Sequence, residues 1–225
     1  MIEAVGSEAV GTGAQRSRAR TGDVVRAVAR LQPGADEGVP GHGPGPVGRL
    51  LTGLVDGPRR GDEEFHTVLL AELARRYLRV VRGHTRRAPL PRVWQVVLDG
   101  WEGLAADPVR VALAGAHALV AHDLAPSVVS ASTVLGRVPA RAERAVVHAV
   151  AERIAGLAED AAAGADAATR DHARGLALLC SRGEGWRQAE HLWAVRGRPS
   201  EAERERAALD WRAALVAEAL LAPGC

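Results

Sequence analysis

Apolar residues recur at helical spacing along most of this chain, and that periodicity limits the folds open to it. Val146, Val150, Ile154 and Leu157, for example, form a stripe at i, i+4, i+8 and i+11 that occupies one face of a helix. No stretch alternates apolar and polar residues for long enough to indicate a strand. The sequence therefore predicts an all-α domain over residues 46–225, a bundle of about six to eight helices.

Acidic, proline and glycine residues indicate where these helices begin and end. The acidic residues after Gly61 suit a first helical turn, Asp107-Pro108 combines an N-cap with proline at the first helical position, and Ser200 with Glu203 has capping-box spacing. We expect a helix over Phe65–Val81 that Gly83 ends, a second helix that Pro91 opens, and a third from Asp107 towards Leu124 that Pro126 stops or kinks. Another helix should begin at Pro139. The last two should cover Asp166–Arg196, with a break near Gly183 and Gly185, and Ser200–Leu221.

The first 45 residues differ in composition from the rest. Residues 33–48 are dense in proline and glycine, which cannot sustain a helix or a ladder of paired strands. A short helix over Asp23–Leu31 is the regular element that we expect in this region. We therefore expect residues 1–45 to form a mobile or loosely docked segment.

Composition excludes several classes of function. All 29 basic residues are arginine, and without lysine there is no Schiff-base chemistry and no P-loop. With 27 acidic residues the net charge is +2, too mixed for a nucleic-acid partner. The two cysteines make no disulfide framework, the N-terminus has no signal-peptide pattern, and no apolar run is long enough to predict a membrane span. We expect a soluble, cytoplasmic protein.

The segment Gly115–Leu124 places His117, His122 and Asp123 in an otherwise apolar helix. Burying these groups without partners would cost several kcal/mol, so they have hydrogen-bond partners, a chemical role or a solvent-facing side. On a regular helix the two histidines are about 140° apart, too far round the axis to bind one metal ion together. One interpretation is a solvated histidine and a core histidine with its partner; the other is a site of proton transfer.

A second polar group falls on a later predicted helix. Arg182, Trp186 and Glu190 follow one another at four-residue spacing, with Trp193 three residues further, so all four lie near one face of a continuous helix. A carboxylate held against indole in a dry site favours its protonated form, as a general acid requires. The structural alternative is an Arg182–Glu190 ion pair inside the bundle.

Several blocks together resemble domain-of-unknown-function family 5995, a bacterial family common in actinobacteria. In collinear order over about residues 50–223, they are Ala74-Arg75-Arg76-Tyr77-Leu78, Pro91-Arg92-Val93-Trp94, Gly115–Leu124, Ser181–Trp193, Leu209-Asp210, Leu220-Leu221 and Pro223. Of the polar set in the family's signature, G-M-N-A-H-I-N-H-D-L-P, only His122 and Asp123 remain; His117 replaces its first Asn, Leu119 its first His and Ala121 its second Asn. If the family holds a metal with that set, this chain has lost it. The resemblance implies an all-α fold and supplies no activity.

Our leading hypothesis is a small-molecule enzyme that uses acid/base chemistry without a metal or cofactor, in a pocket between the His117–Asp123 helix and the Arg182–Trp193 helix. His122 would transfer the proton, oriented by Asp123 or Glu190 and assisted by His117. Arg182, Trp186, Trp193 and Tyr77 would bind a small hydrophobic substrate, possible reactions being cyclisation, isomerisation and hydrolysis.

Two other classes of function stay open. In a non-catalytic ligand-binding or interaction protein, the polar cluster would only specify packing. In a metal-dependent hydrolase similar to the HD phosphohydrolases, His84 and Asp171 would complete a metal set with the His122-Asp123 doublet. The sequence leaves the substrate and the oligomeric state open.

Overall fold

The computed structural model describes residues 45–55, 61–103 and 107–222, and within these ranges every regular element is a helix. Residues 1–44, with the short helix expected at Asp23–Leu31, lie outside the described residues. The helices are α2 (Gly45–Val55), α3 (Glu63–Thr85), α4 (Arg92–Glu102), α5 (Pro108–Ala118), η1 (Leu119–Asp123), α6 (Leu124–Leu135), α7 (Arg141–Ala162), α8 (Ala167–Ser181), α9 (Glu184–Val195) and α10 (Pro199–Leu221). Because α5, η1 and α6 form one continuous helix, the described residues hold eight helices, which confirms the predicted fold class.

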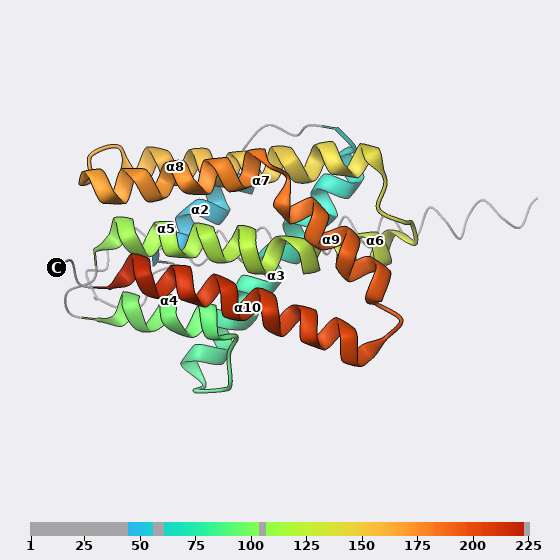
Figure 1. Cartoon of the computed structure of the whole chain (residues 1–225), viewed down its shortest axis with the longest axis horizontal. Coiled ribbons are helices and arrows are strands. Elements are labelled where there is room, and N and C mark those ends of the chain that lie inside the picture. Colours follow the sequence, from blue (N-terminus) through green and yellow to red (C-terminus); the bar gives the residue numbers. More distant parts are fainter. Residues whose placement is uncertain (1–44, 56–60, 104–106, 223–225) are drawn as a thin grey trace, which may run out of the picture.

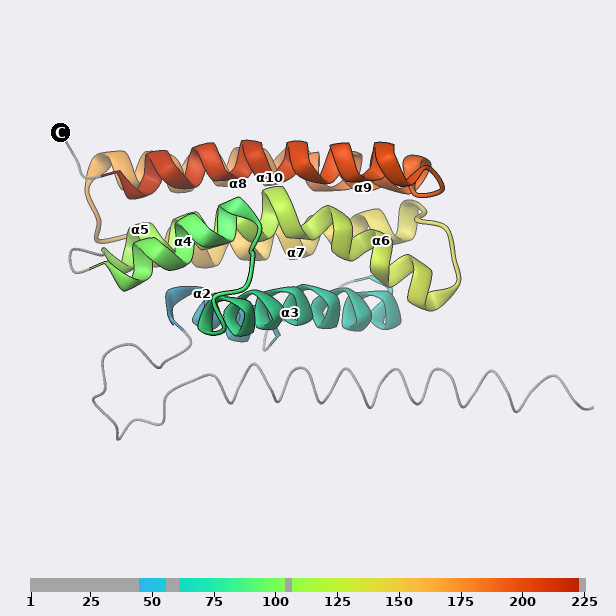
Figure 2. The same cartoon turned by 90° about the horizontal axis from the view of Figure 1, so that it is seen from below.

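The helices run roughly along the long axis of the molecule and lie in three layers (Figures 1 and 2). In Figure 2, α8, α9 and α10 form one outer layer, α4, α5, α6 and α7 the middle layer, and α2 with α3 the other outer layer. The largest fully buried side chains include Trp94, Phe65, Leu69, Leu119 and Ile154, which come from the middle layer and from α3. The core therefore lies where the middle layer packs on its neighbours.

The continuous helix Pro108–Leu135 is the centre of the bundle. Its first part, α5, contacts α2, α4, α7, α8 and α10, and its last part, α6, contacts α3 and α9. It is 28 residues long and contains an 18-residue window with a mean hydropathy of 1.3, which by length and composition alone could cross a membrane, yet 61% of that window is buried inside the bundle. A mostly buried central helix agrees with a soluble protein.

Several boundaries follow the sequence signals. The Asp62 carboxylate accepts a hydrogen bond from the backbone N–H of Phe65 (2.9 Å), and Asp107 accepts one from Val109 (2.8 Å) ahead of Pro108. Gly183, at φ 68°, separates α8 from α9, as predicted. The left-handed backbone there suits glycine because a Cβ would be strained.

Two predicted boundaries are wrong. Helix α3 passes through Gly83 to Thr85, and a Cβ on Gly83 would lie 2.6 Å from Cδ2 of Leu90, so that the flexible leucine side chain would have to shift. Helix α10 begins at Pro199 with Arg198 as its N-cap, so Ser200 lies inside the first turn and does not form the expected capping box. Proline at the first helical position decides this start.

Pro126 does not stop the central helix, which continues to Leu135. The π-helical turn η1 ends three residues before the proline, at Asp123, and the N–H of Leu124 bonds to the carbonyl of Leu119. In a regular α-helix the proline ring would clash with the carbonyl of His122 and supply no N–H to it. The wider π turn accommodates the proline, and it carries His122 and Asp123.

Candidate active site

Sequence blocks that lie far apart meet around η1. Its buried carboxylate, Asp123, is within hydrogen-bond distance of two side chains from different parts of the chain. The residues that come together are Arg76 and Tyr77 of α3, Trp94 of α4, His122 and Asp123 of η1, and Asp210 of α10. Each belongs to one of the blocks that carry the family resemblance.

Both oxygens of Asp123 have a partner. The indole Nε1–H of Trp94 donates to Oδ2 at 2.9 Å, and Nδ1 of His122 lies 2.9 Å from Oδ1. The Asp123 side chain is 3% exposed and that of His122 is 12% exposed. An ionised carboxylate only accepts hydrogen bonds, so the neutral imidazole carries its proton on Nδ1 and leaves Nε2 as the basic atom.

The Nε2 side of His122 faces Asp210, whose Oδ1 lies 4.0 Å away. Asp210 is itself held by the start of α4: its two oxygens accept hydrogen bonds from the backbone N–H groups of Arg92 (2.8 Å) and Val93 (3.0 Å). An aspartate of α10 therefore caps α4 across the helix interface, which fixes its position beside the imidazole.

Arg76 brings a partly buried cation to the same cluster. Burial lowers the pKa of its guanidinium, while the negative charges of Asp123 and Glu72 act in the opposite direction. One of its terminal nitrogens donates to Oγ of Ser130 at 3.3 Å, and its Nε is buried without a hydrogen-bond partner among the described residues. The cation compensates part of the electrostatic cost of burying Asp123.

Tyr77 connects the cluster to a cavity. Its ring lies 5.7 Å from that of Trp94, centroid to centroid, and burial raises the pKa of its hydroxyl to about 12. Tyr77 also lines a cavity of about 840 Å³, to which α2, α3, α4 and α5 contribute residues such as Val81, Leu98 and Trp101. His122 is not among the residues that line this cavity.

The structure does not bring Glu190 to His122. Glu190 is exposed and lines a recess with buried Trp186, to which α7 contributes Arg144 and His148. Helices α9 and α6 pack closely instead: a Cβ on Gly185 would lie 2.8 Å from Cδ2 of Leu124. Of the two orienting residues considered for His122, the structure places Asp123 in contact.

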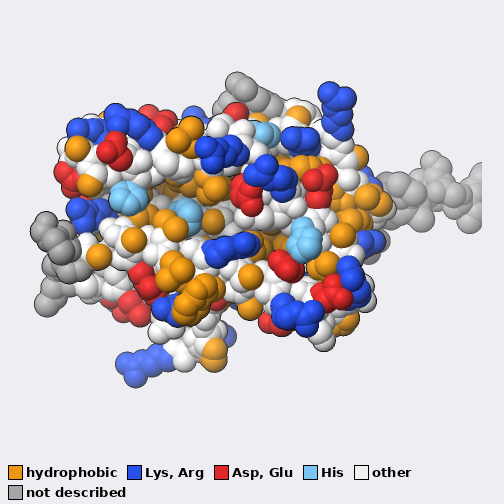
Figure 3. Space-filling model, in the orientation of Figure 1, with side chains coloured by type: hydrophobic (Ala, Val, Ile, Leu, Met, Phe, Trp, Pro, Cys, Tyr) orange, Lys and Arg blue, Asp and Glu red, His pale blue; other side chains and the backbone are white. Residues whose placement is uncertain are grey.

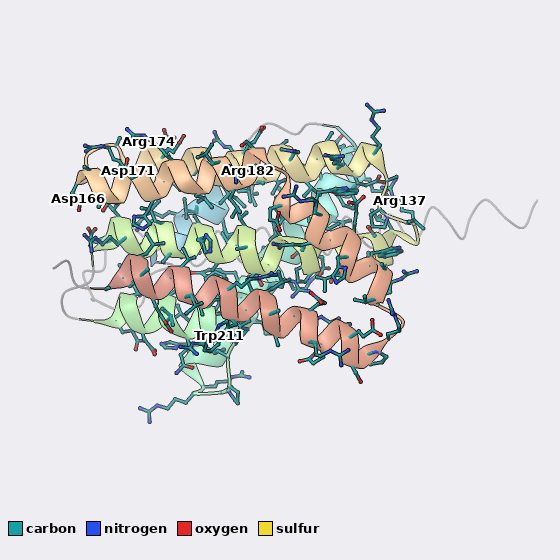
Figure 4. The ribbon with its side chains drawn as sticks, viewed as in Figure 1. Arg137, Asp166, Asp171, Arg174, Arg182 and Trp211 are labelled. Atoms are coloured by element: carbon teal, nitrogen blue, oxygen red, sulfur yellow. The ribbon has the colours of Figure 1, made fainter. Side chains whose placement is uncertain are left out.

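The other residues predicted for this pocket also lie apart. Arg182 is the exposed C-cap of α8, so the break at Gly183 separates it from the helix face of Trp186, and Figure 4 shows it at the α8–α9 junction. Trp193 is half-buried, and the guanidinium of Arg196 stacks 3.8 Å from its ring centroid. His117 lines a separate cavity between α5, α8 and α10.

The ligand set of an HD-type metal site is not assembled. His84 is paired with Glu102 (2.9 Å) in the region between α3 and α4, and Asp171 is paired with Arg174 (2.5 Å) on the surface of α8. In the ranges that the structure describes, no three His, Cys, Asp or Glu side chains form a group that could hold a metal ion. The doublet His122-Asp123 therefore has neither of the partners that this hypothesis requires.

The fold and this cluster define an all-α bundle with a histidine–aspartate pair at its centre, in which the aspartate is buried. The chain belongs to DUF5995, a family of unknown function whose model matches residues 54–223. This confirms the resemblance seen in the sequence, and it places most of α2 before the family domain. Comparisons with curated proteins and with solved structures found no match.

Sequence reasoning missed Arg76, Trp94 and Asp210 as members of the site. All three lie within the blocks that carry the family resemblance, so that signal contained them. Spacing along one helix could not reveal them, because they come from α3, α4 and α10 and meet η1 only through tertiary packing.

Proposed function

We propose that the protein is a small-molecule enzyme in which His122 acts as general base and acid without a metal. The observation that carries the proposal is the His122–Asp123 hydrogen bond of 2.9 Å, with the second carboxylate oxygen held by Trp94. A carboxylate that holds Nδ1 fixes the tautomer and orientation of the ring and stabilises the imidazolium that forms during proton transfer. Asp123 is then an orienting residue and His122 the catalytic one.

The surroundings favour an uncharged, hydrophobic substrate. The exposed part of His122 is small, and the nearby charges of Asp123 and Asp210 each have partners within the protein. A substrate proton within reach of Nε2 would be removed in a site with little water, which suits isomerisation, cyclisation or hydrolysis. We also propose that the protein is cytoplasmic and that it has no nucleic-acid or membrane partner.

A ligand-binding protein without catalysis is the second candidate. The observation in its favour is that the 840 Å³ cavity lined by Tyr77 has the volume of a small-molecule site, whereas His122 lies outside its lining. In that case the His122–Asp123 pair would serve to join η1 to α4 and α10.

The variant His122→Gln separates these functions, because the Gln amide can still donate to Asp123 but cannot exchange a proton at neutral pH. Purified protein is incubated with a fractionated apolar metabolite extract, and consumption is followed by mass spectrometry. We expect wild type to consume a component that His122→Gln converts at least about 100-fold more slowly. The matched control is His191→Gln, an exposed histidine paired with Glu205.

Equal turnover by His122→Gln and wild type would contradict the assignment of His122. A component that co-purifies with wild type in native mass spectrometry and stays chemically unchanged would favour the ligand-binding function. Thermal unfolding of both variants checks that any loss of turnover is not a loss of fold.

A further inference from the structure

A cavity of about 390 Å³ opens between α5, α8 and α10, separate from the His122 cluster. Its walls are mainly aliphatic. The lining residues are Leu113, His117, Asp171, His172, Gly175, Leu176, Leu179, Val216 and Leu220. On the face seen in Figure 3, hydrophobic and histidine side chains gather over the region between α8 and α10 that Figure 1 shows.

His117 is the polar group without a partner in this cavity. Among the described residues it has no hydrogen bond and no ion pair, although its neighbours Ala116 and Ala118 are fully buried. Burial lowers the pKa of its imidazole to about 4, so the ring is neutral at pH 7. A neutral imidazole has one N–H donor and one acceptor nitrogen, and neither is engaged by a protein partner among the described residues.

The other polar residues of the cavity have partners. Asp171 pairs with Arg174 at 2.5 Å, and both project from α8 at the surface (Figure 4). Nδ1 of His172 lies 2.8 Å from the carbonyl oxygen of Ala168. The cavity therefore presents mainly aliphatic walls, and His117 is the half-buried polar side chain of its lining that has no hydrogen bond or ion pair among the described residues.

We propose that this cavity binds a small uncharged molecule with a compact apolar body and one hydroxyl group, such as an alkylphenol or a similar alcohol. The hydroxyl suits His117 because it both donates and accepts, so it can pair with either nitrogen of the neutral ring. An ionised ligand would lose its hydration without meeting an unpaired opposite charge. The volume is within the range of small-molecule sites.

Gly175 offers a direct test of the cavity. It lies in α8 and lines the cavity, and a Cβ built on it meets no atom within 4 Å. Gly175→Leu therefore adds a side chain at the wall of the cavity, starting from a Cβ that has open space, and removes a helix-destabilising glycine. Gly156 of α7 also has open space around its Cβ and does not line the cavity, so Gly156→Leu is the matched control.

The probes are 4-methylphenol and toluene, which have the same apolar frame and differ by the hydroxyl group. Binding to wild type, Gly175→Leu, Gly156→Leu and His117→Leu is measured by calorimetric titration. We expect wild type and Gly156→Leu to bind 4-methylphenol saturably and about fivefold more tightly than toluene, as one hydrogen bond provides. Gly175→Leu should weaken both probes at least about tenfold. His117→Leu should abolish the preference for 4-methylphenol while toluene still binds.

The proposed binding site would be wrong if Gly175→Leu bound the probes as tightly as wild type does. It would also be wrong if wild type bound neither probe. A preference for 4-methylphenol that survives in His117→Leu would overturn the role of His117. Because none of these variants touches His122 or Asp123, either result leaves the proposed acid/base function to its own test.

Discussion

Asp123 is the residue on which the central polar cluster depends. Its side chain is almost fully buried, and each oxygen has a partner on a different residue, Trp94 and His122. Removing one partner of a buried charge lowers the free energy of unfolding by more than the contact itself contributes, because the charge is left without a partner. The pair His122-Asp123 is visible in the sequence, whereas Trp94 lies 29 positions away. The sequence therefore predicts the dyad but not the indole that holds it.

At the same scale, His117 predicts a pH dependence of stability. Its folded pKa of about 4 lies below the ordinary value of 6.5, so between these values the unfolded chain binds a proton that the folded chain does not. The contribution of His117 to the free energy of unfolding is therefore at its maximum above about pH 6.5. It decreases by up to about 3 kcal/mol as the pH falls towards 4.

Urea unfolding of wild type and His117→Leu at several pH values between 7 and 4 measures this contribution. We expect the free energy of unfolding of wild type to fall more steeply with acid than that of His117→Leu. His172, which lines the same cavity, is present in both proteins, so its contribution is common to the two profiles. Parallel pH profiles would contradict the burial of a neutral His117.

At the scale of elements, glycine decides how closely two helices pack. Helix α2 lies against α5 at Gly115, where an added Cβ would overlap Cγ2 of Val47 and lie 3.2 Å from its Cβ. Valine has little rotamer freedom in a helix, so it cannot easily move aside. The sequence shows a glycine inside a helix, which ordinarily weakens the element, but only the packing shows why it is there.

We expect Gly115→Ala to destabilise the protein by about 1–3 kcal/mol through overpacking. Gly156→Ala, in the open part of α7, should instead be neutral or stabilising by up to about 1 kcal/mol. Urea unfolding measures both, and hydrogen exchange should localise the effect of Gly115→Ala to α2. Equal effects of the two substitutions would contradict the α2–α5 contact.

For the whole molecule, Cys180 reports on the integrity of the core. Its thiol is buried, and burial, with a smaller effect of Glu152, raises its pKa to about 12. Alkylation requires the thiolate and access to solvent, so it proceeds only when the fold opens.

In a Cys225→Ser background, iodoacetamide at pH 8 should modify native Cys180 at least about 1,000-fold more slowly than the urea-unfolded chain, given the usual stability of a domain. The modification is followed by intact-protein mass spectrometry. Native Cys180 that reacts as fast as the unfolded chain would show that this part of the bundle is not packed as described.

The sequence by itself determined the helical class, most of the helix boundaries and the His122-Asp123 doublet, because these depend on local periodicity, caps and adjacent residues. Tertiary structure alone decided which residues share a site. Spacing along one helix placed Arg182 beside Trp186 and Glu190, but the chain turns at Gly183 and separates them. The site instead draws Arg76, Trp94 and Asp210 from three other helices. Periodicity fixes which face of a helix is apolar, whereas the neighbour of that face depends on the packing of all the helices together.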